Sequence, residues 1–243
     1  EGANEAYSHY GTLHGMAIPL VTYPMSSLSS FAGLLVPEFS EDLSAGRTSR
    51  MSRIASKALN TTLAYSVITA VFLFTFSEDL GYTIYHSYDA GYYISTLSLV
   101  VPIMYLDHVT DSMLKGLGEQ VFSMWVNISD SLLSVILVCV LIPRMGIIGY
   151  AVVIVVMEGY NFILSFTRLS RKVKFKIEPI KYLLVPFVSS LVSAHLVKIL
   201  FAYGGSYVTP VGLFLKVVFA LSITVAAYSL LGLYTNKKEL SKR

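Results

Sequence analysis

The chain has 243 residues, of which 54% are hydrophobic and only 14% are charged, and its mean hydropathy is +0.64. Soluble domains carry about 25% charged residues, so the composition excludes a soluble globular protein and indicates an integral membrane protein. The formal net charge of +3 gives no reason to expect a nucleic-acid partner. The single cysteine, Cys139, lies in an apolar stretch, which excludes an internal disulfide and suggests no metal site.

Seven mostly apolar stretches follow one another along the chain. Each has about 20 residues or more, the length that a helix needs to cross about 30 Å of hydrocarbon. They are residues 12–36, 58–77, 90–114, 121–142, 147–167, 182–203 and 210–233. The sequence therefore predicts an all-α, polytopic membrane protein with seven transmembrane helices.

The Lys and Arg residues are distributed unevenly between the ends of these stretches. Fifteen of the eighteen fall at alternate ends, in 47–57, at Lys115, in 168–181 and in 237–243, whereas the other ends hold only Arg144. Cytoplasmic segments of membrane proteins are enriched in Lys and Arg. The pattern predicts an external N-terminus, a cytoplasmic C-terminus and membrane lipids as neighbours of the basic flanks.

Residues 1–11 form a polar segment that we expect outside the membrane. Because the chain starts with Glu and shows no signal peptide, we interpret it as a fragment whose upstream part is missing. Pro19 and Pro24 are expected to kink the first helix, which is predicted to stop at Pro37, and Pro102 is expected to kink the third.

Residues 38–57 form the longest polar connection. Their basic residues recur at helical spacing, which fits either an amphipathic helix on the inner membrane surface or a helical extension of the next span. Further on, residues 116–118 predict a tight turn that joins the third and fourth helices as an antiparallel hairpin. Residues 143–146 predict a short outer turn.

Carboxylates and amides inside the predicted spans are candidates for a substrate cavity or an ion-coupling site. A charge at the centre of a membrane helix costs about 2.5–3.5 kcal/mol and should therefore face protein or water. The candidates are Asp107, Asp111, Asn127, Asp130, Glu158 and Asn161. Asp111 can instead pair with Lys115 one turn on, and Glu158 can instead hold the bundle together through an interhelical hydrogen bond.

Lys198 and Lys216 lie near the outer ends of the last two predicted helices. Snorkelling to the headgroups and contact with the phosphate of a polyprenyl carrier both account for them. His108 fits a packed or interfacial histidine better than a proton relay. We recognise no catalytic, metal-binding or nucleotide-binding motif, so we expect neither enzymatic activity nor a cofactor.

Four stretches in register resemble the MOP flippase superfamily of multidrug, oligosaccharidyl-lipid and polysaccharide exporters. They are residues 10–20, 35–41, 114–120 and 141–151. The likeness extends over about residues 8–172. It is to the C-terminal half of the polysaccharide biosynthesis branch, which includes stage V sporulation protein B.

The resemblance implies a parent with two lobes around a central cavity. This chain would supply the second lobe over 12–172, with the inner-surface linker 38–57, and then a basic loop, two peripheral helices and a basic tail over 173–243. The implied function is export of a lipid-linked oligosaccharide or a polysaccharide or cell-wall precursor by alternating access. The implied partners are a polyprenyl-linked sugar and the absent N-terminal lobe, in a bacterial plasma membrane.

Two other functions stay open at this point: a cation-coupled multidrug antiporter of the same superfamily, and a membrane scaffold that transports nothing. Lipid II flippases carry an acidic–basic pair where this chain has the uncharged residues 18–20, which favours the sporulation and polysaccharide branch. Glu119 stands where the family often has a basic residue.

Overall fold

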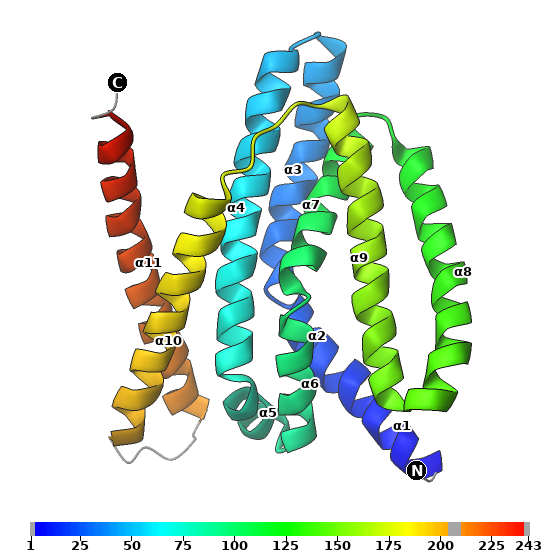
Figure 1. Cartoon of the computed structure of the whole chain (residues 1–243), viewed down its shortest axis with the longest axis vertical. Coiled ribbons are helices and arrows are strands. Elements are labelled where there is room, and N and C mark those ends of the chain that lie inside the picture. The colour runs from blue at the N-terminus through cyan, green and yellow to red at the C-terminus, as the bar shows by residue number, and fades with distance from the viewer. Residues whose placement is uncertain (1–2, 204–209, 241–243) are drawn as a thin grey trace.

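The computed structural model describes residues 3–203 and 210–240, and in this part the chain is helical apart from turns and one connecting segment, 173–178 (Figure 1). The elements are α1 (Ala3–Thr12), the π-helical turn η1 (Leu13–Ala17), α2 (Ile18–Thr22), α3 (Met25–Ser44), α4 (Thr48–Thr75), α5 (Ser77–Tyr85), α6 (Tyr88–Ser98), α7 (Val101–Gly116), α8 (Gln120–Met145), α9 (Ile147–Lys172), the π-helical turn η2 (Ile180–Leu184), α10 (Val185–Tyr203) and α11 (Pro210–Leu240). The all-α prediction is confirmed.

Several of these helices are long and apolar enough to cross a membrane. Four meet this description, namely α4, α8, α9 and the run from η2 into α10. The bent pair of Tyr7–Thr22 and Met25–Ser44 makes a fifth when it is counted as one span. The protein is therefore a multi-pass membrane protein. The predicted span 90–114 is divided between α6 and α7, and the described apolar part of α11, Val211–Ala226, is shorter than a full span.

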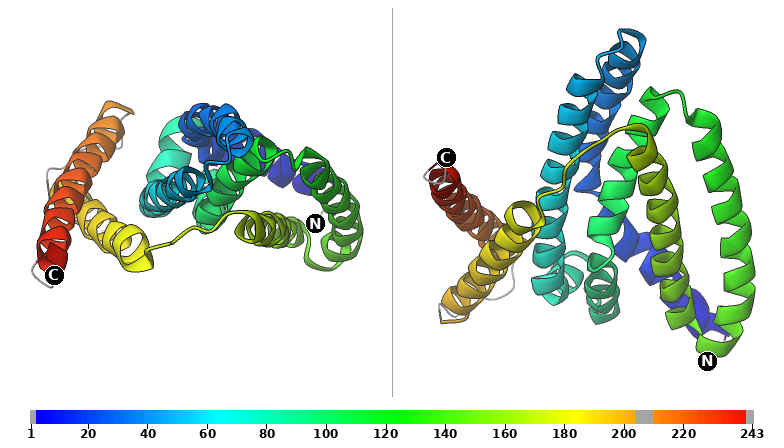
Figure 2. Two further views of the ribbon diagram at one scale, coloured as in Figure 1. Left: turned by 90° about the horizontal axis from the view of Figure 1, so that it is seen from above. Right: turned by 45° about the horizontal axis from the view of Figure 1, so that its top comes forward.

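The helices form a bundle around α7 (Figures 1 and 2). Helices α3, α4 and α9 contact α7, α8 contacts the other side of α9, and the α10–α11 pair lies against α4. The α3–α4 turn, the α7–α8 turn and the end of α9 share one end of the bundle, which we call the basic end. Arg144 lies at the opposite end, and the side chains of 237–243 lie outside the described residues.

Two predictions about turns are wrong. Helix α3 continues through Pro37 to Ser44, and α8 continues through its own proline to Met145. In α3 the extra turns are stabilised because Phe39 is fully buried in the core and the Asp42 carboxylate accepts hydrogen bonds from arginines beyond the turn. Since α4 begins at Thr48, the segment 38–57 consists of two helix ends and a turn, which is the helical-extension interpretation.

The predicted pairing of the third and fourth helices as a hairpin is also wrong, because α8 packs mainly against α9 and only slightly against α7. Gly118 adopts a left-handed φ of 76° after α7, and the Glu119 N–H closes that helix by bonding the Leu114 carbonyl. Gly116 holds the end of α7 against α3, where an added Cβ would lie 2.7 Å from the Phe39 Cβ. The turn thus directs α8 away from α7 and opens a space between them.

The first predicted span breaks at Pro24, where the axes of its two halves differ by 55°. Proline has no N–H, so a break leaves carbonyls that need other donors. The Tyr105 hydroxyl of α7 donates to the Val21 carbonyl at 2.8 Å, and the Tyr65 hydroxyl of α4 donates to the Pro24 carbonyl at 2.9 Å. Pro19 lies in the first turn of α2 and Pro102 in the first turn of α7, just after the α6–α7 break.

Removing one of these hydroxyls tests what the bend depends on. Tyr105→Phe is expected to destabilise the protein by about 1–3 kcal/mol, because the buried Val21 carbonyl then has no donor. Thermal unfolding in detergent micelles measures this, with Tyr92→Phe as the control, since the Tyr92 side chain is exposed. Equal stability of the two variants would show that the bend does not need this hydrogen bond.

Candidate polar pocket between α7, α8 and α9

Three helices turn polar faces toward one another in the half of the bundle nearer the basic end. The pocket between them has a volume of about 180 Å³. It is lined by Met25 of α3, by Met104, Asp107, His108 and Asp111 of α7, by Ser123, Val126 and Asn127 of α8, and by Glu158, Asn161 and Ser165 of α9. Its position follows from the turn that separates α8 from α7.

Helical periodicity explains why each set of residues shares a face. On α9, Glu158, Asn161 and Ser165 are separated by three and four residues, the spacing that aligns side chains on one side of a helix. The α7 and α8 linings show the same spacing. Phe162, at the edge of the polar face of α9, packs against the core around α3, α4 and α7.

Several polar atoms here are buried but have no hydrogen-bond partner within the described part of the chain. They are one oxygen each of Asp107, Asp130 and Asn161, and the Ser123 hydroxyl. Buried polar groups in proteins are almost always paired. These acceptors are therefore oriented toward something outside the described chain, such as water, a ligand or another part of the protein.

Five of the six residues predicted as cavity candidates line this pocket: Asp107, Asp111, Asn127, Glu158 and Asn161. The sixth, Asp130, is not in the lining but lies close enough to Asn161 and Glu158 to interact with both electrostatically. The structure thus brings the six residues together, although they come from three different helices.

The structure also confirms the ion-pair interpretation of Asp111 and the packed-residue interpretation of His108. Asp111 pairs with Lys115 at 2.7 Å, four residues on, while still lining the pocket. The His108 Nε2 lies 3.0 Å from the Ser29 hydroxyl of α3, so this histidine is a packed, hydrogen-bonded residue.

The sequence reasoning missed two serines of the pocket. Ser165 lies four residues after Asn161 on α9, and Ser123 lies four residues before Asn127 on α8. The spacing could have revealed both. Serine is common in membrane helices, however, because its hydroxyl can bond to the carbonyl one turn earlier, so it gives a weak signal.

The pocket opens sideways along α8. A wider groove of about 520 Å³ shares Ser123 and Asn127 with it and continues along Gln120, Ile128, Ser131 and Leu132. Most of the other large apolar side chains of α8, including Trp125, are exposed. The groove therefore connects a polar interior to a strongly apolar outer face.

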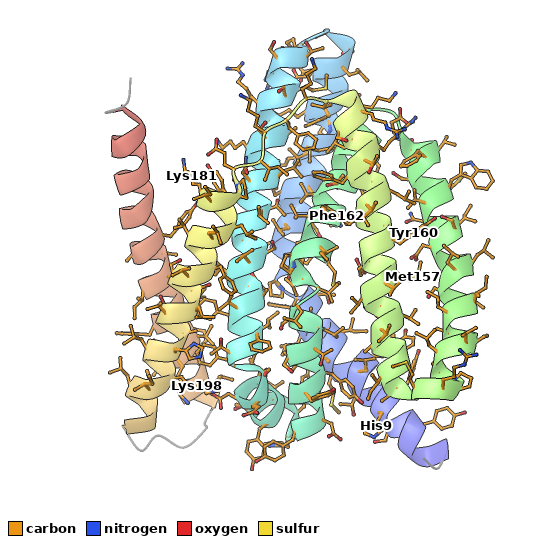
Figure 3. The ribbon with its side chains drawn as sticks, viewed as in Figure 1. His9, Met157, Tyr160, Phe162, Lys181 and Lys198 are labelled. Carbon is orange, nitrogen blue, oxygen red and sulfur yellow. The ribbon has the colours of Figure 1, made fainter. Side chains whose placement is uncertain are left out.

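An ion-pair cluster joins the α7–α8 turn to the end of α9 at the basic end of the bundle. Glu119, in the α7–α8 turn, contacts Lys172 at 2.6 Å and Arg168 at 2.7 Å, both on α9, and the Arg168 guanidinium also lies over the Phe122 ring. Lower down, Tyr160 of α9 reaches the Ser129 hydroxyl of α8 at 3.0 Å (Figure 3). These contacts explain why an acid at position 119 suits this chain.

The Glu119 cluster predicts a pH dependence. Hydrogen bonds from Lys172 and then Arg168 hold the pKa of Glu119 below its ordinary value. Its contribution to stability is therefore present above about pH 4.3, the ordinary pKa of Glu, and is lost as the pH falls through the lowered pKa. Glu119→Gln should unfold at a lower temperature than the parent at about pH 7, and the difference should shrink below about pH 4.

Thermal unfolding of both proteins over this pH range measures the effect. Glu178→Gln is the matched control, because Glu178 is exposed and forms no ion pair with the described residues. A difference between parent and Glu119→Gln that stayed constant down to about pH 3 would contradict the assignment, since the carboxylate is neutralised there.

Lys198 and Lys216 lie far from this pocket, at the opposite end of the bundle. The Lys216 amino group is 3.8 Å from Asp79 and the side chain is largely buried, whereas Lys198 donates to the Thr75 carbonyl at 3.3 Å (Figure 3). Both therefore attach the α10–α11 pair to the α4–α5 corner. The structure does not bring these two lysines together with the carboxylates of the pocket.

Comparison with known proteins connects this architecture to a family. Residues 16–141, more than half of the chain, match the MatE family. The chain belongs to the MatE family. The match runs from the end of η1 through nearly all of α8, so it includes the pocket residues of α7 and α8 but not those of α9. The predicted resemblance to the MOP superfamily is thereby confirmed.

The chain is also similar in sequence to a named bacterial protein. The MatE chain is 28% identical over 152 residues to stage V sporulation protein B of Bacillus subtilis (strain 168). The alignment covers 62% of this chain and 29% of that protein, so the chain spans less than a third of its relative's length. Family and relative together agree with the predicted resemblance to the MOP superfamily.

Proposed function

We propose that this chain is the C-terminal part of a bacterial flippase that exports a lipid-linked oligosaccharide or a polysaccharide or cell-wall precursor. The observation that carries the proposal is the pocket of unpartnered carboxylate and amide oxygens that opens through a groove to an apolar helix face. Such acceptors suit the hydroxyl groups of a sugar, and the apolar face suits a lipid tail in the bilayer.

The rest of the proposed mechanism comes from the resemblance to the MOP superfamily. The sugar head group would bind between this lobe and the N-terminal lobe that the MOP resemblance implies, and the two lobes would alternate between inward-open and outward-open states. The position of the basic turns at one end of the bundle supports an orientation with the N-terminus outside and the basic end in the cytoplasm of a bacterial plasma membrane. The proposed number of seven spans comes from the apolar stretches of the sequence.

Reconstitution into liposomes tests the proposal. The full-length protein that carries this chain should move a fluorescent polyprenyl-diphosphate-linked sugar between leaflets, measured by loss of access to an added lectin or periodate. Dye efflux driven by a proton or sodium gradient, without lipid movement, would instead assign a multidrug antiporter. Absence of both activities in folded protein would leave a scaffold and overturn the proposal.

A further inference from the structure

The connecting segment 173–178 is attached to α4 by side chains rather than by backbone pairing. The Ser52 hydroxyl donates to the Lys174 carbonyl, the Ser56 hydroxyl accepts from the Lys176 N–H at 3.0 Å, and the Asn60 amide donates to the Lys176 carbonyl at 2.9 Å. The Asn60 side chain also accepts from the N–H of Glu178 at 3.0 Å. Figure 1 shows this segment passing over α4 on its way from α9 to α10.

The two backbones run parallel in matched register. The three α4 side chains, Ser52, Ser56 and Asn60, are four residues apart, which corresponds to a rise of about 6 Å per step along the helix. They bond to Lys174, Lys176 and Glu178, which are two residues apart, or about 6.6 Å in extended chain. Each turn of α4 therefore faces one two-residue step of the segment.

This register sets cations side by side. Val173 is buried and Phe175 packs on the core, so the alternate residues Lys174 and Lys176 point outward and are exposed. Arg53 and Lys57 follow the first two bonding serines of α4 by one residue and are exposed as well. Arg53 thus follows the serine that bonds Lys174, and Lys57 follows the serine that bonds Lys176; we call these two pairs the basic rungs.

These four cations have no acidic partner within the described part of the chain, in contrast to those of the Glu119 cluster. The one carboxylate of the segment, Glu178, lies beyond the second rung and forms no ion pair with the described residues. Exposed apolar side chains follow directly, with Ile177 38% and Ile180 68% exposed. Cations followed by exposed apolar residues are typical of a membrane–water interface.

We propose that the two rungs, Arg53 with Lys174 and Lys57 with Lys176, bind the phosphate group of an anionic bilayer phospholipid. Each rung offers two cationic side chains to a phosphate. The apolar side chains beyond the rungs contact the acyl chains. The bound lipid would hold the connecting segment on α4 and thereby fix the α10–α11 pair to the rest of the bundle. The inference does not depend on which substrate is transported.

Native mass spectrometry of the purified full-length protein tests the proposal with dioleoyl phosphatidylglycerol and dioleoyl phosphatidylcholine as probes. Phosphatidylglycerol should be retained preferentially. Each Lys or Arg near a headgroup is worth roughly a fivefold change in affinity, so the variant with Arg53→Gln, Lys57→Gln, Lys174→Gln and Lys176→Gln should bind it at least about tenfold more weakly. Arg144→Gln, a cation at the opposite end, should bind it as the parent does.

A second variant separates geometry from net charge. Asn60→Leu keeps all four cations but removes two of the bonds that set the register, so phosphatidylglycerol retention should fall although the charge is unchanged. Equal retention of both lipids by the parent, or unchanged retention in the four-cation variant, would overturn the proposal. Displacement of the lipid by about millimolar inorganic phosphate would assign the rungs to a free anion instead.

Discussion

Under the proposed function, the full-length protein with Asp107→Asn and Glu158→Gln together is expected to move a lipid-linked substrate at least about tenfold more slowly than the parent. Both carboxylates line the pocket, and one oxygen of Asp107 has no partner in the described chain. A hydrogen bond to a charged group contributes about 1.5–3 kcal/mol. Since about 1.4 kcal/mol corresponds to a factor of ten, the loss of one such bond accounts for the expected effect.

The same substitutions should leave the fold intact. Asp107, Asp130 and Glu158 lie close enough to repel one another when charged. Amides keep the size of the side chains and remove part of that repulsion, so the variant should unfold at the same temperature as the parent or higher. The liposome assay and thermal unfolding are therefore measured on the same preparation.

The control for this pair is Asp89→Asn, an exposed carboxylate in the first turn of α6 at the other end of the bundle. It should translocate substrate at the parental rate. If the pocket variant also translocates at the parental rate with normal protein levels, Asp107 and Glu158 do not belong to the substrate site.

Gly81→Ala is expected to have the largest effect on stability. Helices α5 and α6 cross at Gly81 and Gly91, where a Cβ on Gly81 would lie 2.4 Å from the Gly91 nitrogen and 2.8 Å from the Ser87 carbonyl oxygen. Both are backbone atoms, which cannot move aside as the end of a flexible side chain can. Overpacking costs about 1–3 kcal/mol, so we expect a loss near the upper end of that range.

Thermal unfolding in detergent checks this prediction, and Gly33→Ala is the matched control. Gly33 lies inside α3 with nothing within 4 Å of its added Cβ. Alanine there improves helix propensity by about 0.8–1.0 kcal/mol, so this variant should be at least as stable as the parent. If the two variants had equal stability, the close crossing of α5 and α6 would be excluded.

The hydropathy and charge of the sequence were sufficient to predict much of the fold. Helix formation and the length of apolar stretches are local properties, so the all-α membrane class was correctly predicted. Prolines were the least reliable local signal. Pro24 breaks its helix, but Pro37 does not, because buried contacts beyond it outweigh the one missing hydrogen bond.

The candidate site was also partly predictable, because the spacing of residues along one helix is a local property. Asp107 and Asp111, and likewise Glu158 and Asn161, share a helix face through spacings of three and four, which the sequence reveals directly. The pairing of Asp111 with Lys115 is local too. Lys198 and Lys216, in contrast, contact α4 and α5 through partners more than 100 residues away, which spacing does not indicate.

The sequence by itself determined the class of protein, the apolar helices, the clustering of basic residues and the polar face of each helix, because these depend on residues within a few turns of one another. Only the tertiary structure decided that α8 leaves α7 and leans on α9, that three polar faces meet in one pocket, and that the segment 173–178 lies along α4. Those arrangements depend on a left-handed glycine, close helix crossings and hydrogen bonds between distant residues, and their joint geometry is set by the packing of the whole bundle.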